Sequence, residues 1–487
     1  MQRTFVLNLA LIILLNLIIK PLYIFGIDAE VQNRVGTEIY GLYFSLLNLT
    51  FLFNIILDFG IANYTSKTIA QNPKLVSSYF SKLLSIKFLL FAFYILTILL
   101  TAFILGYENL SLKILSLLII NQFLVATIQF IRANLTGLHC FKAEAFISVL
   151  DRSLLIIICS TLLFTPLLSY RFTIFNFILA QMAAYGLTGI VSLIILSKYI
   201  KPIKLKFNKQ YTRTLLKESA PYAILIFLMF IYNRIDAIMI ERLLPDGKLQ
   251  AGIYAQGFRY LDAVNMIALL FAGLLLPIFA RLIKEKKNIY EMVLTPFKLL
   301  IPGAILVSIL GFFFANSIMN WRYVADTSAS VLPFSILIIS FIPISLTYIF
   351  GTLLTANGNL KALNYMALFG VILNLTLNFI LIPNYKSEGA AVATLITQSL
   401  TAIIQIALVF KVFRFAINWT LLFKTLIFAG IMISINLEPF KQIIGFGNLS
   451  ENLQLLVYFC IGTILLIMFG FIRLAGFYSM LKQSKSK

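Results

Sequence analysis

The organisation of this chain follows from one basic segment, Lys198-Tyr-Ile-Lys201-Pro-Ile-Lys204-Leu-Lys206-Phe-Asn-Lys209, which separates two long apolar runs. A second basic segment, Arg281-Leu-Ile-Lys284-Glu-Lys286-Lys287, separates a later pair of apolar runs. Loops rich in Lys and Arg remain on the cytoplasmic side of a membrane. Both segments are therefore predicted to be cytoplasmic. The even number of apolar runs before each of them places the N-terminus on the same side.

Apolar runs recur along almost the whole chain. It has 487 residues, is 61% hydrophobic and 12% charged, and has a mean hydropathy of +0.96, whereas soluble domains contain about 25% charged residues. A run of about 20 apolar residues is long enough to cross a bilayer as a helix. The sequence thus predicts an all-α polytopic membrane protein with about 14 transmembrane helices, at 5–27, 40–62, 82–105, 113–135, 147–166, 174–197, 219–241, 255–280, 293–315, 331–356, 364–383, 389–411, 421–437 and 452–474.

The longest basic gap divides the chain into halves. We expect an N-terminal six-helix lobe at 1–200, a basic cytoplasmic linker at 201–218 and a C-terminal six-helix lobe at 219–411. Residues 412–487 are expected to add two transmembrane helices and a basic cytoplasmic tail.

The two halves share a short motif. Gly36-x4-Gly41-Leu-Tyr43 opens the second span, and Gly247-x4-Gly252-Ile-Tyr254 opens the eighth. Because each half has an even number of spans, the halves are predicted to be parallel repeats around a central cavity. This is a common plan for alternating-access transporters.

The net charge of +21 does not indicate a nucleic-acid partner. The basic residues lie mainly in the predicted cytoplasmic gaps, where they orient the protein and contact anionic lipid headgroups. The sequence lacks a G-x-x-x-x-G-K-[ST] phosphate loop and a Cys/His cluster, and its three cysteines lie apart. We therefore expect no ATPase activity, no metal site and no cofactor. The short outer loops argue against a membrane-embedded glycan polymerase, so the chain is not expected to be an enzyme.

The most informative polar group inside a predicted span is Asn233-Arg234-Ile-Asp236. Arg234 lies roughly 20 Å along its helix from the cytoplasmic end, in the outer half of the membrane. Arg234 and Asp236 point about 200° apart, so each needs a partner on another helix or a hydrated cavity. Both residues, with Asn233, are candidates for substrate binding in the cavity, and the alternative is a structural bridge between helices.

Other charged and polar residues within the spans have two interpretations each. Arg259 and Asp262, spaced i,i+3, either pair locally or complement Asp236 and Arg234 across the cavity. Lys20, beside the helix-disturbing Pro21, either faces the cavity or extends to the outer headgroups.

Two further sets complete the candidates. Asn374 and Asn378 share a helical face and either contact a polar ligand or connect helices. Arg132, Arg152 and Asp58 lie near predicted cytoplasmic ends, and we expect them to line an inner vestibule or to anchor the interface.

Several motifs resemble one known family. The motifs are Val35-Gly-Thr-Glu-Ile-Tyr-Gly41-Leu-Tyr43, Leu57-Asp58-Phe-Gly60, Arg234-Ile-Asp236, Ala251-Gly252-Ile-Tyr254, Leu276-Pro277-x-x-Ala-Arg281, Thr355-Ala-Asn-Gly358-Asn-Leu-Lys361, Leu373-Asn374-Leu-Thr-Leu-Asn378-Phe-Ile-Leu-Ile-Pro383 and Glu388-Gly389-Ala-Ala-Val-Ala-Thr394. They are similar to the polysaccharide transporter family, the O-antigen-type flippases of the multidrug/oligosaccharidyl-lipid/polysaccharide (MOP) exporter superfamily. The resemblance covers nearly the whole chain.

The resemblance implies two lobes around a central cavity and a function in glycan export. Such a protein moves an undecaprenyl-pyrophosphate-linked oligosaccharide from the inner to the outer leaflet of the bacterial cytoplasmic membrane by alternating access, for synthesis of O-antigen (lipopolysaccharide) or exopolysaccharide. A polysaccharide polymerase and a coupling ion are the further partners that it implies. Arginine in the cavity suits a pyrophosphate, because its planar fork makes bidentate, charge-assisted bonds.

Three other functions remain as alternatives. A multidrug antiporter of the same superfamily would favour an acidic, aromatic cavity, whereas here arginines accompany the acids. A flippase for the peptidoglycan precursor would have a similar fold. The third alternative, from a different class, is the membrane glycan polymerase. Under the leading hypothesis the protein is a multi-pass protein of the inner membrane with both termini in the cytoplasm.

Overall fold

The computed structural model describes residues 15–62, 65–66, 69, 72–200, 209–437 and 449–471. Within these residues every regular element is a helix, and twelve helical segments are long and apolar enough to cross a membrane. The predicted span at 5–27 begins outside the described residues, and the segment Leu360–Phe413 contains two of the predicted spans. The prediction of an all-α polytopic membrane protein is confirmed.

The chain forms two compact units, which are described separately. Unit 1 comprises Met1–Ala255, Tyr323–Ala325 and Ala367–Ala390. Unit 2 comprises Gln256–Arg322, Asp326–Met366 and Ala391–Lys487. Residues 201–208 of the predicted linker and the predicted cytoplasmic tail lie outside the described residues. The predicted division into two six-helix lobes stays a prediction.

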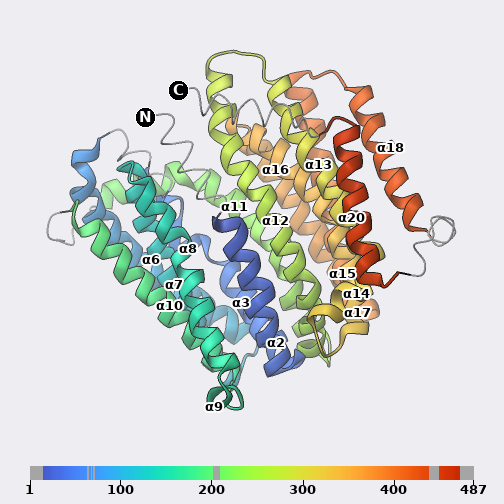
Figure 1. The fold of residues 1–487 in the computed structure, drawn as a ribbon. Coiled ribbons are helices and arrows are strands. Elements are labelled where there is room, and N and C mark those ends of the chain that lie inside the picture. The colour runs from blue at the N-terminus through green and yellow to red at the C-terminus, as the bar shows by residue number, and fades with distance from the viewer. Residues whose placement is uncertain are drawn as a thin grey trace. The chain divides into compact units, whose positions relative to one another are not determined.

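Unit 1 is a helical bundle in which α3 and α7 occupy central places (Figure 1). Helix α7 packs against α10, α8 and α3, and α3 also packs against α11. Aromatic and aliphatic side chains from α6, α7 and α10 form the core between them. The elements are η1 (Leu22–Asp28), α2 (Ala29–Val35), α3 (Thr37–Leu52), α4 (Ile55–Asp58), η2 (Pro73–Leu75), α6 (Val76–Ile104), α7 (Asn109–Gly137), α8 (Phe141–Phe164), α9 (Pro166–Ser169), α10 (Ile174–Ser197) and α11 (Lys209–Leu243).

The first span changes its helix type at a proline. The described residues from 15 onward are α-helical up to Pro21, and the π-helix η1 follows. Proline has no backbone N–H to donate, so the regular hydrogen-bond ladder is interrupted at this point. π-Helical turns within α-helices are rare and are frequently found at functional sites.

Helix α11 begins earlier than the sequence predicted. The span predicted at 219–241 would begin at Ser219, but α11 already starts at Lys209 and contains Pro221 in its interior. The second half of the predicted linker is therefore helical. Pro221 is exposed, so the carbonyl group that loses its partner lies at the surface of the helix and not in the core.

The glycine motifs of the two halves pack against each other. A Cβ atom on Gly41 of α3 would collide with the backbone oxygen of Lys248, in the first turn of α12 (Gly247–Lys284). A Cβ atom on Gly252 would collide with the backbone oxygen of Thr37. In addition, the Gln32 amide donates a 3.0 Å hydrogen bond to the Gly252 carbonyl. The two helices thus cross at backbone contact, which only small residues permit.

Unit 2 is built around α13 (Tyr290–Phe313), which packs against α15, α16, α18 and α20. The predicted span at 331–356 consists of two helices that meet at Ser340. The Ser308 hydroxyl donates a 2.8 Å hydrogen bond to the carbonyl of Ile338 beside this junction. The other elements are the rest of α12, α14 (Ala315–Arg322), α15 (Thr327–Ile339), α16 (Phe341–Ala356), the parts of α17 (Leu360–Phe413) on either side of Ala367–Ala390, α18 (Trp419–Asn436) and α20 (Glu451–Met468).

Two predicted spans, 364–383 and 389–411, follow each other without a loop. They form α17, whose backbone breaks at Lys386 with φ 49° and ψ −132°. The Lys386 ammonium group donates a 2.9 Å hydrogen bond to Asp246, and Ser387 donates one of 3.1 Å to Gln250. The bond from Lys386 lowers the pKa of the Asp246 carboxyl. These contacts hold the break against the start of α12.

Candidate functional site

One face of the first span is directed toward α8. The Asn16 amide donates a 3.1 Å hydrogen bond to the Ser148 hydroxyl. About two turns later, the guanidinium carbon of Arg152 lies 4.7 Å from the centre of the Tyr23 ring. Lys20 lies between these two contacts at the spacing of one helical face. The half-buried Lys20 therefore lies beside α8.

Arg152 is held on the faces of aromatic rings. It donates a 3.1 Å hydrogen bond to the Tyr185 hydroxyl, whose ring centre is 5.7 Å from the guanidinium carbon. The Asp151 carboxylate is 3.9 Å away. Arg152 lies near the middle of α8, about 16 Å along the helix from Phe141. The Arg152 side chain is still 28% exposed.

Arg132 completes a group of three cations. Its guanidinium group binds the Glu144 carboxylate, and its side chain is 31% exposed. Lys20 interacts electrostatically with Arg132, Arg152 and Asp151. We name Lys20, Arg132 and Arg152 the cationic cluster. Both arginines remain partly exposed although each contacts a carboxylate, and such guanidinium groups suit an anionic ligand. The structure thus combines a lysine predicted for the cavity with two arginines predicted for the vestibule.

Asp28 belongs to the same region, and the sequence analysis did not include it. The residue is fully buried in η1. Its carboxylate accepts hydrogen bonds from the hydroxyl groups of Tyr40, at 2.5 Å, and Tyr23, at 3.4 Å. Tyr23 also contacts Arg152, so the buried carboxylate and the cationic cluster form one network. Asp28 lies one residue beyond the predicted end of the first span, so the span prediction does not identify it as a membrane-embedded acid.

Arg234 contacts α3 within unit 1. Its Nη1 atom donates a 3.5 Å hydrogen bond to the Oδ1 atom of Asn48. Its guanidinium carbon lies 5.6 Å from the centre of the Phe51 ring. The neighbouring Asn233 is half-buried. A role of Arg234 and Asn233 in substrate binding stays a prediction.

Asp236 lies in a group of buried polar side chains, which we name the Asp236 cluster. The carboxylate is 1% exposed. It accepts hydrogen bonds from the Tyr254 hydroxyl at 2.8 Å, from Asn374 at 3.2 Å and from Asn378 at 2.7 Å. These three hydrogen bonds come from neutral donors. Asn374 and Asn378 use their shared helical face for these bonds, and their contact with a substrate stays a prediction.

In unit 2, Arg259 and Asp262 pair locally. The Nη1 atom of Arg259 lies 3.7 Å from a carboxylate oxygen of Asp262, which is the i,i+3 arrangement that the sequence allowed. Their side chains are 11% and 17% exposed. A contribution of this pair to a substrate-binding cavity stays a prediction.

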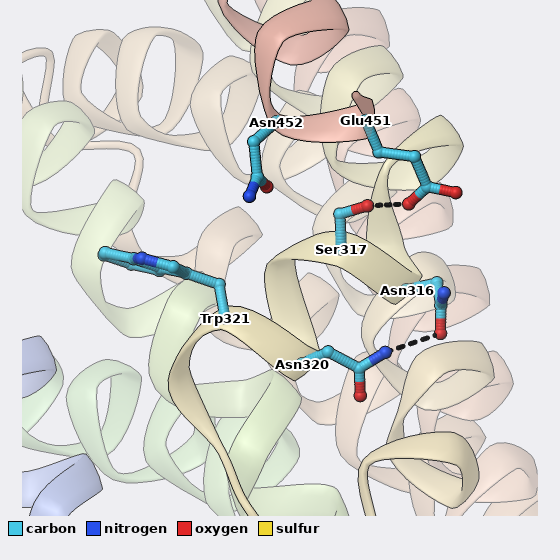
Figure 2. A pocket seen from close by; sticks show the side chains of 6 residues that line it. All are labelled: Asn316, Ser317, Asn320, Trp321, Glu451 and Asn452. Carbon is cyan, nitrogen blue, oxygen red and sulfur yellow. Dashed lines mark hydrogen bonds between the residues drawn. The ribbon is translucent and has the colours of Figure 1, made fainter. Parts of the chain in front are cut away.

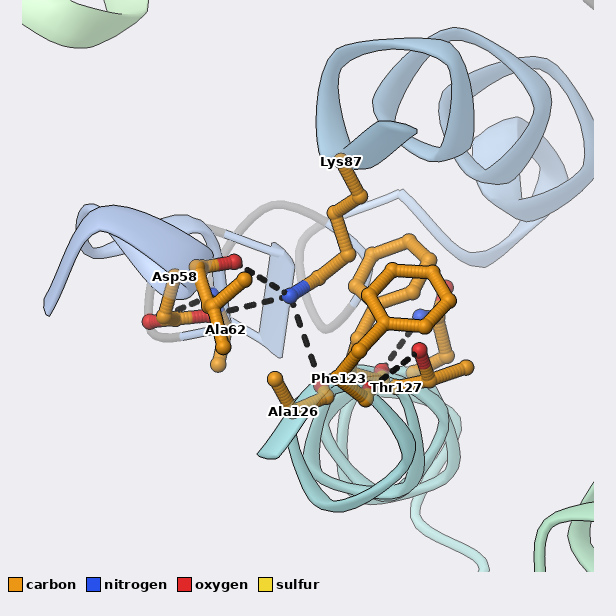
Figure 3. A network of polar contacts seen from close by, with 9 residues as sticks. Asp58, Ala62, Lys87, Phe123, Ala126 and Thr127 are labelled. Carbon is orange, nitrogen blue, oxygen red and sulfur yellow. Dashed lines mark hydrogen bonds and ion pairs between the residues drawn. The ribbon is translucent and has the colours of Figure 1, made fainter. Parts of the chain in front are cut away.

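Asp58 pairs with a buried lysine, as Figure 3 shows. Lys87 of α6 is 2% exposed, and its ammonium nitrogen lies 3.6 Å from the Asp58 carboxylate. The same group donates to the carbonyls of Leu57, at 3.0 Å, and Ala126, at 3.3 Å. The chain then turns through Phe59 and Gly60, with φ of 44° and 81°. The Leu57-Asp58-Phe-Gly60 motif therefore supplies an acid for Lys87 and a glycine for the turn.

Comparison with known proteins places this chain in a family. The model of the family described as polysaccharide biosynthesis protein matches residues 5–283, more than half of the chain. An uncharacterized membrane protein of Methanocaldococcus jannaschii is 25% identical to this chain over 390 residues. The match covers 75% of this chain and 88% of that protein.

Solved transporter structures share the fold. A structure of the lipid II flippase MurJ in an inward closed conformation has a TM-score of 0.62 and 16% identity, and the match covers 98% of this chain and 99% of that one. The Vibrio cholerae MATE transporter VcmN has a TM-score of 0.58 and 13% identity, covering 84% of this chain and 95% of that one. Together with the family match, these similarities show that the chain belongs to the polysaccharide biosynthesis protein family and has the fold of transporters of the MOP superfamily.

Proposed function

We propose that this protein is a flippase that moves a lipid-linked oligosaccharide from the inner to the outer leaflet of a membrane. The cationic cluster of unit 1 is the observation that carries the proposal. A glycan that crosses a bilayer on a lipid carrier brings the phosphate groups of its linkage to membrane depth. There they require cations that are exposed to a ligand and held within the protein.

The chemistry of the cluster favours a pyrophosphate linkage. Arginine makes charge-assisted, often bidentate bonds to phosphate oxygens, and the cluster contains two arginines, at 132 and 152. The apolar tail of the carrier would remain among the lipids while the sugars follow the pyrophosphate.

The resemblance of the sequence motifs to O-antigen-type flippases supports the finer parts of the proposal. We propose undecaprenyl as the carrier, O-antigen or exopolysaccharide units as the glycan, and the bacterial inner membrane as the location. A coupling ion and a polysaccharide polymerase are the proposed partners. A peptidoglycan precursor has the same pyrophosphate chemistry and remains the second candidate, favoured by the structural similarity to the lipid II flippase. The cationic cluster disfavours organic cations, the substrates expected of a multidrug antiporter.

Arg152 provides the direct test of ligand chemistry. Replacing Arg152 with alanine is expected to weaken binding of geranylgeranyl pyrophosphate to the protein in nanodiscs by at least about tenfold, because a hydrogen bond to a charged group contributes about 1.5–3 kcal/mol. Arg152→Lys should restore part of the affinity, since the ammonium group keeps the charge but lacks the planar guanidinium group that binds two phosphate oxygens at once. Arg171→Ala, an exposed arginine of the same unit, serves as the control. Parental affinity of the Arg152→Ala protein would contradict the proposal.

The transport step has its own readout. Deleting the gene should leave lipid-linked glycan on the inner leaflet and remove the corresponding surface polysaccharide. Arg152→Ala should reproduce this defect while the protein still inserts and folds. Surface glycan that persists in the deletion strain, in the absence of a second flippase, would refute the proposed activity.

The orientation of the chain can be measured independently. In a background without Cys140, Cys159 and Cys460, we expect an impermeant maleimide to label Asn452→Cys in intact cells. Lys286→Cys should react only after permeabilisation, because its basic loop is predicted to be cytoplasmic. The reverse pattern would show that the predicted topology is wrong.

A further inference from the structure

A polar pocket in unit 2 has no part in the transport chemistry described above. It has a volume of about 320 Å³ and lies where α14 meets the first turn of α20 (Figure 2). This volume is at the lower end of the range for small-molecule sites. Its lining residues are Asn316, Ser317, Asn320, Trp321, Glu451 and Asn452.

The helical spacing of α14 arranges most of this lining. Asn316 and Asn320 are one turn apart, as are Ser317 and Trp321, so the two pairs form adjacent rows on one side of the helix. The Asn320 amide donates a 3.0 Å hydrogen bond to the side-chain oxygen of Asn316, and the Ser317 hydroxyl donates to the Glu451 carboxylate. These contacts hold the polar groups in place before a ligand arrives.

The groups that remain available are of mixed hydrogen-bonding character. Both amide hydrogens of Asn316, the side-chain oxygen of Asn320 and the second carboxylate oxygen of Glu451 have capacity beyond the two contacts above. Asn452 adds a complete amide at the opposite wall (Figure 2). Such a set suits a ligand whose hydroxyl groups each donate and accept hydrogen bonds.

Trp321 adds a flat apolar surface to this polar pocket. Its side chain is 70% exposed, and Figure 2 shows the indole ring extending from α14 below Asn452. An exposed tryptophan next to amides and a carboxylate combines a large contact area with polar partners. The ring face can stack on the C–H face of a pyranose while the equatorial hydroxyl groups reach the amides.

We propose that this pocket is a binding site for a neutral saccharide. The Glu451 carboxylate would accept a hydrogen bond from a sugar hydroxyl, and it would repel the carboxylate of an acidic sugar or a phosphate group. The sugar specificity of the site is thus set by one charge. The ligand chemistry does not depend on the proposed flippase activity.

The position of the pocket is consistent with a role on the outer surface. Helix α13 runs from the basic loop that ends at Lys287, which is predicted to be cytoplasmic, to α14 at its opposite end. Figure 1 likewise shows α14 and the start of α20 at the end of unit 2 that lies opposite the α12–α13 connection. The site would therefore hold saccharide on the side to which a glycan exporter delivers its product.

The sequence provides a specific reporter, because the chain contains two tryptophans, Trp321 and Trp419. In a Trp419→Phe protein, Trp321 emission reports on the pocket alone. The protein should be studied in nanodiscs free of sugar detergents, with maltose and N,N′-diacetylchitobiose as probes and glucuronic acid as the acidic comparison. We expect at least one neutral probe to cause a saturable blue shift and to protect Trp321 from acrylamide quenching, and glucuronic acid to do neither.

Matched variants separate this site from unspecific effects. Asn320→Ala and Asn452→Ala should each weaken binding of the neutral probe by about tenfold, and Glu451→Gln should allow glucuronic acid to bind. The converse reporter, Trp321→Phe with Trp419 retained, should not respond. The proposal is overturned if neither neutral probe changes Trp321 emission up to about 0.1 M. It is also overturned if Asn320→Ala and Asn452→Ala respond like the parent.

Discussion

Replacing Lys87 with methionine is expected to lower the free energy of unfolding by about 3–5 kcal/mol, the cost of removing one partner from a buried ion pair. The Lys87 side chain is 2% exposed and pairs with Asp58 at 3.6 Å. It also donates to two backbone carbonyls, those of Leu57 and Ala126. Methionine fills a similar volume, so the loss should come from the uncompensated carboxylate and the carbonyls and not from a cavity. Denaturant unfolding in detergent measures the change.

The double variant Lys87→Met/Asp58→Asn shows whether the unpaired charge is the cause. In the native protein the backbone N–H of Ala62 donates a 3.2 Å hydrogen bond to Asp58. Asparagine at position 58 keeps an oxygen for this bond and removes the charge. We expect the double variant to recover most of the lost stability. Lys113→Met, at an exposed position of α7, should have almost no effect. If Lys87→Met unfolds at the parental denaturant concentration, the ion pair does not stabilise the fold.

Replacing Gly252 with leucine is expected to separate α3 from the start of α12 and to lower the free energy of unfolding by about 3 kcal/mol, the upper part of the usual range for overpacking. The new Cβ atom would collide with the backbone oxygen of Thr37. Because backbone atoms cannot rotate away as a side chain does, the helices must move. The Gln32 hydrogen bond to the Gly252 carbonyl would be weakened as well. Thermal unfolding and a transport assay measure the two consequences.

Gly273 is the matched control on the same helix. Apart from the adjoining residues and the backbone of its own helix, no heavy atom lies within 4 Å of a Cβ atom built on Gly273, and the residue is exposed. Gly273→Leu should therefore leave the unfolding temperature unchanged or raise it slightly, because leucine favours helix more than glycine does. Equal stability of the Gly252→Leu and Gly273→Leu proteins would show that the backbone contact at Gly252 is unimportant.

The spans could be predicted because membrane insertion acts on local sequence. Length and apolarity of each run decide whether it can remain in hydrocarbon, so the segment Ile174–Ser197 coincides with its prediction. The ends of the helices were less predictable, because a helix can continue beyond the apolar run into water. Helix α11 is an example: it starts at Lys209, ten residues before Ser219, and continues through Pro221.

Contacts between side chains on the same helix could be predicted from their helical spacing. Arg259 and Asp262 pair at i,i+3, and Asn374 and Asn378 share a face at i,i+4. The common partner of the two asparagines was not predictable in this way. Asp236 is more than 130 residues distant from them, and spacing within one helix does not determine which other helix lies opposite.

The sequence alone therefore determined the membrane environment, the helical class and the family of this protein, because hydrophobicity and short motifs are properties of local segments. Only the tertiary structure brought Lys20, Arg132 and Arg152 into one cationic cluster and enclosed Asp28 between Tyr23 and Tyr40. It also placed the polar row of α14 against the first turn of α20 to form the pocket beside Trp321. The physical reason is that helix packing, which is decided by side-chain contacts between remote segments, sets the neighbours of every polar group within the membrane.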